Sequence, residues 1–218
     1  MADIFEEVSK EVQQEKLKRL WKENQKAIST VLTCIIVAVA IFAYWQYRQQ
    51  EIREEASSDY TDSMFLLTMG HPDRALKSLE VIPQKSGHTY ADLSKLLGAG
   101  ILTDKGDIQG AIDSYESLLQ TSSNQEFKNL ALLKLLYLQS QMLPAPEIIE
   151  KLQPLLTKGN PWYYLAKELQ GTLLYQQGEI DKAAAVFQEL TADKNLPAPQ
   201  RLRLQLLRSN FLYKTQKQ

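Results

Sequence analysis

Residues 106–115, GDIQGAIDSY, share a pattern with residues 70–79, GHPDRALKSL, and with residues 178–187, GEIDKAAAVF. Each stretch opens on a glycine, has an alanine five residues later, and ends on a large apolar residue: Leu79, Tyr115 or Phe187. A small residue stands seven positions before each glycine: Ser63, Ala99 or Gly171. The glycines are 36 and then 72 residues apart, which predicts a 36-residue repeat with one degenerate unit. That unit should turn near residue 142, where QMLPAPEIIEKL has prolines in place of the glycine.

Each position of the pattern has a physical role in a pair of helices. The glycine ends the first helix in a left-handed cap, and an acid or a proline starts the second helix. The alanine allows two helices to cross closely, and the large residue fills the space between repeats. This order matches the tetratricopeptide repeat. The chain is therefore predicted to be all-α, with a TPR-like α-solenoid of about four helical hairpins plus a C-terminal capping helix.

The same periodicity predicts where the helices begin and end. The expected ranges are 48–69, 72–82, 89–104, 107–120, 124–141, 145–157, 161–177, 179–192 and 198–214. The last of these places Leu202, Leu206 and Phe211 on an apolar stripe and ends in a basic tail, as a capping helix would.

A second feature is the uncharged stretch of 21 residues between Lys26 and Arg48. As a helix it is long enough to cross the apolar core of a bilayer, about 30 Å thick. Trp21 stands before it, and Tyr44, Trp45 and Tyr47 crowd its far end, as interfacial anchors do. We predict a single-pass anchor at 27–47.

Two alternatives to a permanent anchor are a cleaved signal peptide and a lipoprotein. The small residues Ala38 and Ala40 suggest a cleavage site, but they lie inside the apolar run, and the preceding region carries six acids. A lipid-accepting cysteine should close the apolar run, whereas Cys34 lies near its start. The uncleaved anchor is favoured over both.

The basic residues around the span predict its orientation. Before the span there are six: Lys10, Lys16, Lys18, Arg19, Lys22 and Lys26. Only Arg48 and Arg53 follow within twenty residues. Because basic flanks stay cytoplasmic, 1–26 should be cytoplasmic and 48–218 should form a periplasmic domain.

Residues 1–26 are expected to form an amphipathic helix, since Ile4, Phe5, Val8 and Val12 fall three to four residues apart. This segment is either a docking helix for a membrane partner or headgroups, or a solvated lead-in to the span. The sequence favours neither interpretation.

Composition argues against several functions. A formal net charge of −1 argues against nucleic acid binding. The two histidines, His71 and His88, and the single cysteine leave little for a transition-metal site. Asp104 and Asp107 flank Gly106, but a helix end followed by an acid at a helix start explains them better than calcium does. Without a phosphate loop or a nucleophile motif, we expect neither an enzyme nor a cofactor.

A binding role remains, and the first helix of each repeat should line the concave face. Projecting the repeat onto this face predicts a protein-binding groove lined by Tyr60, Met64, Leu96, Asn129, Leu132, Glu168, Thr172 and Tyr175. Such a mixed apolar and aromatic groove suits extended or unfolded polypeptide. Burial between repeats is an equally good interpretation of Leu96 and Leu132.

The N-terminal sequence resembles that of a known family. Residues 3–8, DIFEEV, and residues 18–22, KRLWK, running into one membrane span, resemble the bacterial YfgM-like family, in particular its alphaproteobacterial members. These proteins are also called ancillary SecYEG translocon subunits. The resemblance implies an inner-membrane protein beside the Sec translocon, linked to periplasmic chaperones that include a prolyl-isomerase-like foldase, PpiD. It brings no catalytic residues.

Two functional hypotheses follow. The first is a translocon-associated adaptor or chaperone that binds emerging polypeptide or a foldase. The second is an envelope scaffold for cell-wall or outer-membrane assembly complexes, with no role in export.

Overall fold

A computed structural model describes the backbone of residues 2–85 and 89–215, and the side chains of residues 22, 24–27, 29–83 and 89–207. The chain divides into two compact units, Met1–Glu54 and Glu55–Gln218. His88 and the side chains of 1–21, including those of the predicted amphipathic segment, lie outside the described residues.

The first unit consists of the greater part of helix α1, Ala2–Thr68. Within the described residues, Asn24–Thr68 is one helix long and apolar enough to cross a membrane, and it includes the predicted span. The hydroxyls of Thr30 and Thr33 donate to the carbonyl oxygens of Lys26 and Ser29, each at 2.8 Å. These bonds satisfy polar groups that would otherwise be costly in lipid. The domain boundaries 1–26, 27–47 and 48–218 stay predictions.

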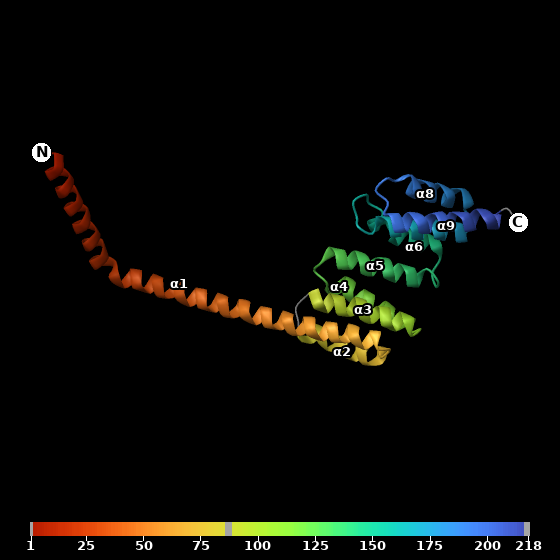
Figure 1. Cartoon of the computed structure of the whole chain (residues 1–218), viewed down its shortest axis with the longest axis horizontal. Coiled ribbons are helices and arrows are strands. Elements are labelled where there is room, and N and C mark those ends of the chain that lie inside the picture. Colours follow the sequence, from red (N-terminus) through yellow and green to blue (C-terminus); the bar gives the residue numbers. More distant parts are fainter. Residues whose placement is uncertain (1, 86–88, 216–218) are drawn as a thin grey trace. The chain divides into compact units, whose positions relative to one another are not determined.

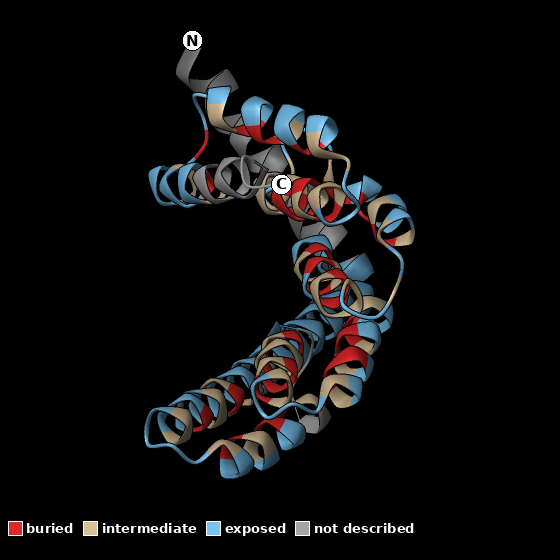
Figure 2. Cartoon of the chain, turned by 90° about the vertical axis from the view of Figure 1, so that its right-hand side faces the viewer, coloured by how far each residue is buried: buried red, intermediate tan, exposed pale blue. Residues whose placement is uncertain are grey.

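The second unit is an array of helical hairpins and confirms the predicted fold class (Figure 1). The end of α1 is followed by α2 (Pro72–Lys85), α3 (Thr89–Asp104), α4 (Ile108–Thr121), α5 (Gln125–Gln139) and α6 (Ala145–Lys151). A short 3₁₀ helix, η1 (Gln153–Leu155), precedes α7 (Tyr163–Gln176), α8 (Ile180–Ala192) and α9 (Ala198–Thr215). Figure 2 shows the hairpins following one another along a curve, with buried residues on the sides where helices meet.

The turns between paired helices form as the glycine pattern predicts. Gly70, Gly106 and Gly178 have φ angles of 77°, 81° and 79°. In the first of these turns, the N–H groups of Gly70 and His71 each donate at 2.9 Å, to the carbonyl oxygens of Leu67 and Leu66. The other two turns make the same pair of bonds, which defines the Schellman cap.

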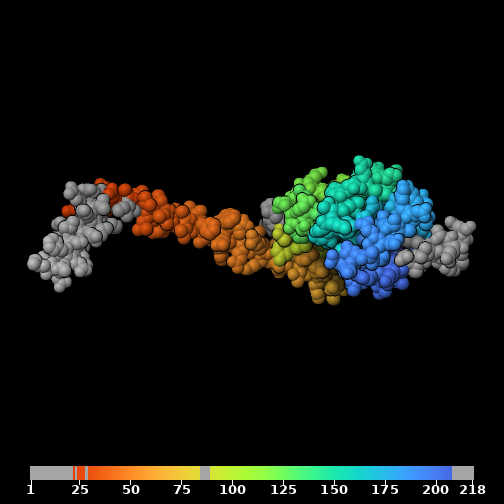
Figure 3. Space-filling view, turned by 90° about the horizontal axis from the view of Figure 1, so that it is seen from above, coloured from red at the N-terminus to blue at the C-terminus, as the bar shows by residue number. Residues whose placement is uncertain are grey.

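The size pattern of the repeat is also confirmed. The alanines after the turns are buried, with exposed fractions of 0% to 2%, and so are the preceding small residues and the large residues that follow (Leu79, Tyr115, Phe187). The core is built of four clusters, each made by neighbouring helices, as in a solenoid. Figure 3 shows the surfaces of successive helices in residues 89–207 meeting closely.

The degenerate unit turns where predicted, but its second helix is shorter than expected. We predicted one helix over 145–157, whereas α6 ends at Lys151 and η1 follows. Pro154 explains the break, because proline has no N–H to donate and disfavours α-helical geometry at the residue before it. Leu152 and Leu155 are nevertheless fully buried, so the irregular segment still closes the core.

Helix α9 caps the array with a different face from the one predicted. Leu202 and Leu206 are 62% and 58% exposed, while Leu204, between them, is 1% exposed and packs in the last core cluster. The predicted stripe is therefore wrong as the packing face. The side chain of Phe211 lies outside the described residues.

Candidate protein-binding groove

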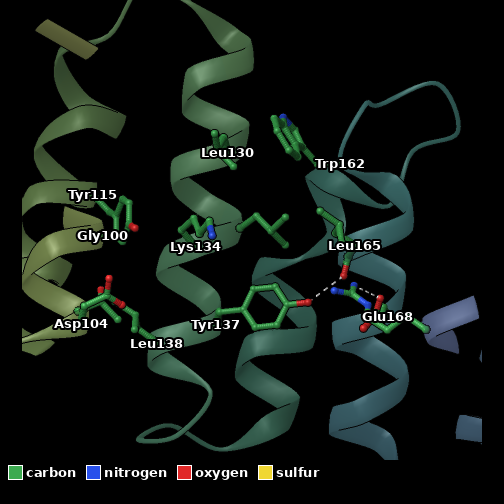
Figure 4. Close-up of a pocket in the computed structure, with 13 residues that line it drawn as sticks. Gly100, Asp104, Tyr115, Leu130, Lys134, Tyr137, Leu138, Trp162, Leu165 and Glu168 are labelled. Atoms are coloured by element: carbon green, nitrogen blue, oxygen red, sulfur yellow. Dashed lines mark hydrogen bonds and ion pairs between the residues drawn. The ribbon is translucent and has the colours of Figure 1, made fainter. Parts of the chain in front are cut away.

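The repeat array contains a groove with a volume of about 700 Å³, lined mainly by the first helices of the hairpins, α3, α5, α7 and α9 (Figure 4). Helix α5 contributes one wall through Leu130, Lys134, Tyr137 and Leu138. These residues are three to four positions apart, so they share one face of the helix. This wall is apolar apart from Lys134, which is exposed.

The facing wall comes from α7, which turns Leu165 and Glu168 toward Tyr137 (Figure 4). The hydroxyl of Tyr137 donates to the carbonyl oxygen of Leu165 at 3.5 Å. Burial raises the pKa of Tyr137 to about 12, the Glu168 carboxylate adds to the rise, and the Arg203 guanidinium opposes it. The tyrosine is therefore a neutral donor at physiological pH.

An ion pair joins α7 to α9 at the edge of the groove. Glu168 is 8% exposed, and Arg203 of α9 donates to its carboxylate. Since a buried carboxylate is costly without a partner, this contact both stabilises Glu168 and attaches the last helix.

The third part of the lining comes from α3 and α4. Gly100 leaves open space, because a Cβ there would meet nothing within 4 Å. Tyr115 is buried beside it, and burial, followed by the charge of Asp104, raises the pKa of its phenol. Asp104 itself is exposed at the rim. The groove thus combines apolar and aromatic walls with charges of both signs.

Such a lining suits polypeptide better than a small metabolite. The apolar walls can take side chains, while Lys134 and Asp104 at the rim can meet backbone or charged groups. Among the described residues, no cluster of three or more His, Cys, Asp or Glu side chains is placed to hold a metal ion. Asp107 instead caps α4, accepting the N–H of Gly110 at 3.0 Å.

The structure does not gather the eight predicted groove residues at one site. Glu168 is the one that lines this groove. Leu96 and Leu132 pack against core clusters, in agreement with the alternative of burial between repeats. Asn129 is 9% exposed and accepts a bond from the Gln125 amide at 3.0 Å.

The other four predicted residues lie nearer the two ends of the array. Tyr60 packs on the first core cluster, with its ring 6.1 Å from that of Tyr90. Met64 is 42% exposed. The Thr172 hydroxyl donates to the Glu168 carbonyl oxygen at 2.9 Å, and Tyr175 packs against the last cluster. A role for these residues in binding stays a prediction.

The groove residues that sequence reasoning missed had one usable signal. In the run ALLKLLYL, residues 131–138, Lys134 is the single charge. A lone lysine in an apolar helix marks the solvent-facing side, and Leu130, Tyr137 and Leu138 lie on that side at helical spacing. Arg203, which comes from the capping helix, had no such signal.

The fold and the groove define a class: a membrane-anchored helical-repeat protein that offers a binding surface and shows no catalytic group. A family model described as a tetratricopeptide repeat-like domain matches residues 18–207, so the chain belongs to that family.

Two curated relatives match nearly the whole chain. One, from Escherichia coli strain K12, is 25% identical over 186 residues, which are 85% of this chain and 88% of the relative. The other, from Aggregatibacter actinomycetemcomitans, is 24% identical over 198 residues, covering 89% and 94% of the two chains. Each is called "Ancillary SecYEG translocon subunit". The resemblance to this YfgM-like family is thereby confirmed, whereas its alphaproteobacterial character stays a prediction.

Proposed function

We propose that this chain is an inner-membrane-anchored TPR adaptor associated with the Sec translocon. The observation that carries the proposal is the match to two ancillary SecYEG translocon subunits along 88% and 94% of their lengths. Because the match takes in most of each relative, it favours a shared role for the whole architecture over a shared repeat alone.

In this proposal the N-terminus is cytoplasmic and the repeat array is periplasmic. The excess of basic residues before the span supports this orientation. A cysteine placed at Ser123, in the exposed α4–α5 turn, tests it in a Cys34→Ser chain. A maleimide that cannot cross the inner membrane should label this cysteine, but not a Ser9→Cys control, in cells with a permeabilised outer membrane. The reverse labelling would contradict the orientation.

The groove is the proposed binding site, either for emerging secretory polypeptide or for a segment of a periplasmic foldase such as a PpiD-like protein. Its volume of about 700 Å³ suits a few side chains of a bound segment rather than a folded surface. The neutral Tyr137 phenol and the paired Glu168 leave Lys134 and Asp104 as the charged groups at the rim. Binding would then depend on apolar contacts, with charge setting the orientation of the segment.

Photo-crosslinking in whole cells tests this assignment. A photoreactive amino acid replaces Lys134 or Leu138 in the groove, and Tyr60, Leu132 or Tyr175 from the predicted set. Glu116, which is exposed on α4, provides a matched control outside the groove. We expect groove positions to capture secretory chains, translocon subunits or a foldase, and Glu116 to capture none of them.

The alternative function is an envelope scaffold for cell-wall or outer-membrane assembly complexes. Capture of wall-assembly enzymes alone at Lys134 and Leu138 would support this alternative and contradict the adaptor. Equal capture from Glu116 and from the groove would instead show that the groove is not the binding site.

A further inference from the structure

Exposed large apolar side chains gather at the two ends of the repeat array. Within the described residues from 55 onward, those at the N-terminal end are Met64, Phe65, Met69 and Val81, which are 41% to 62% exposed. Those at the C-terminal end are Leu202 and Leu206 of α9. Between the ends, only Met142 in the α5–α6 turn is similarly exposed. Solenoid ends need polar outer faces to stay soluble, so apolar ends imply a covering surface.

The exposed leucines of α9 lie where a first helix normally receives its partner helix. In α7, Leu169 packs back on the preceding hairpin, while Lys167 and Gly171, two residues to either side, face α8. The Lys167 ammonium lies 2.8 Å from the Glu189 carboxylate, and a Cβ on Gly171 would come within 2.8 Å of the Phe187 ring.

Helix α9 repeats this arrangement. Leu204 packs back on the cluster that includes Phe187, and Leu202 and Leu206 stand two residues to either side of it. By this correspondence they belong to the face that would pack on a second helix. Within the described residues α9 is the last helix, so that helix is not supplied by the next element of the chain.

The N-terminal end presents the complementary face. Phe65 lies 36 residues, one repeat, before Ile101. Ile101 is the residue by which α3 packs on Leu79 and Ile82 of the preceding hairpin. Phe65 therefore occupies the face by which a first helix meets the hairpin before it, and it is 62% exposed because none precedes α1.

Charge also distinguishes the two ends. Within the second unit, the α1 sequence EASSDYTDSMFLLT, residues 55–68, contains the acids Glu55, Asp59 and Asp62 and no basic residue. The α9 sequence APQRLRLQLLRSNFLYKT contains four basic residues and no acid. Two α9 helices would repel each other, whereas an α9 end and an α1 end would attract.

We propose that copies of this chain associate head to tail, with the acidic α1 end of one repeat array packing on the basic α9 end of the next. The junction would bury Phe65 and Met69 of one copy against Leu202 and Leu206 of another, as each internal junction buries its apolar residues. Because the interface is heterologous, it can continue beyond a dimer. Anchoring both copies in one membrane would raise their effective concentration. This association does not depend on what the groove binds.

Site-specific crosslinking of the full chain in membranes tests the proposal. Two differently tagged copies, both Cys34→Ser, carry Thr61→Cys and Gln205→Cys, which are exposed neighbours of the apolar contacts and leave them intact. A short bismaleimide should give mixed-tag dimers, and one chain carrying both cysteines should give a ladder of higher oligomers. Pairing Gln205→Cys with Ser123→Cys, in the middle of the array, is the matched control and should give no mixed-tag dimer.

Substitution of the apolar contacts provides the second measurement. Leu202→Glu with Leu206→Glu should reduce the yield of mixed-tag dimers roughly tenfold, which corresponds to about 1.4 kcal/mol of association. These side chains are exposed, so the thermal midpoint of the array should change little. Dimers formed only between Gln205→Cys copies, crosslinks only to a different protein, or no crosslink at all would each overturn the proposal.

Discussion

At the scale of single residues, the array depends on matched sizes at the crossing of paired helices. The tightest case is Gly171, where an added Cβ would lie 2.8 Å from Cζ of Phe187. Phe187 is itself 2% exposed, so its ring has little room to move. The large residue and the small residue are thus one packing unit, separated by the turn at Gly178.

Gly171→Ala should therefore destabilise the array although alanine favours helix. We expect a loss of about 1–3 kcal/mol, typical of overpacking, measured as the unfolding midpoint of the purified full chain. Gly100→Ala is the matched control, because a Cβ there meets nothing within 4 Å, and it should be neutral or slightly stabilising. Adding Phe187→Leu to Gly171→Ala should restore part of the loss. Equal effects of the two alanines would contradict the packing argument.

Tyr137 gives the array a specific response to alkaline pH. Burial raises its pKa to about 12, above the value of about 10 of an unfolded tyrosine. The folded state therefore favours the neutral phenol, and this contribution to stability is complete below about pH 10 and lost as the pH rises through about 12.

Tyr137→Phe removes the titrating hydroxyl, so its stability should fall less steeply than that of the wild type between about pH 10 and 12. Urea unfolding midpoints across this range measure the difference. Some slope should remain, because the pKa of Tyr163 is also raised to about 12, by burial and then by its hydrogen bond to Glu189. Identical slopes for the two proteins would show that Tyr137 does not titrate in this way.

At the scale of helices, the turns were predictable because local chemistry decides them. Gly70, Gly106 and Gly178 each need a left-handed conformation, and sequence alone locates such positions well. Helix α3 begins and ends at the predicted residues, 89 and 104. The break after Lys151 was missed because Pro154 was weighed less than the apolar periodicity around it.

The groove was less predictable than the helices that line it. Lining depends on how each helix is rotated about its axis, and a shift of one residue turns a side chain by about 100°. Leu132 and Lys134 illustrate the consequence, since the first packs on the core and the second lines the groove. The participation of Arg203 depends on packing between helices far apart in sequence, which no local pattern encodes.

The attachment of α9 offers a test at this scale. Arg203→Ala should leave the buried Glu168 carboxylate without its ion-pair partner and destabilise the array by about 1–3 kcal/mol. Combining it with Glu168→Gln should recover part of the loss, because the uncompensated charge is removed. Thermal unfolding of the four variants of this double-mutant cycle provides the coupling. Additive effects of the two substitutions would contradict the ion pair.

At the scale of the whole molecule, a membrane helix and a helical-repeat domain divide the work. The span was recognisable because 21 uncharged residues are rare outside membranes. The repeat domain was recognisable because its period recurs. The partner, in contrast, is decided by surfaces that the pattern does not specify, and here the two relatives supply the strongest indication.

The most direct test of the account is co-purification of SecYEG subunits with the full chain from crosslinked cells. A chain in which residues 1–45 are replaced by an unrelated single-span anchor provides the comparison, with equal amounts confirmed in the membrane. The account predicts that SecY, SecE and SecG accompany the wild-type chain and are strongly reduced with the exchanged anchor. Absence of all three from the wild-type sample, with wall-assembly proteins recovered equally from both chains, would contradict it.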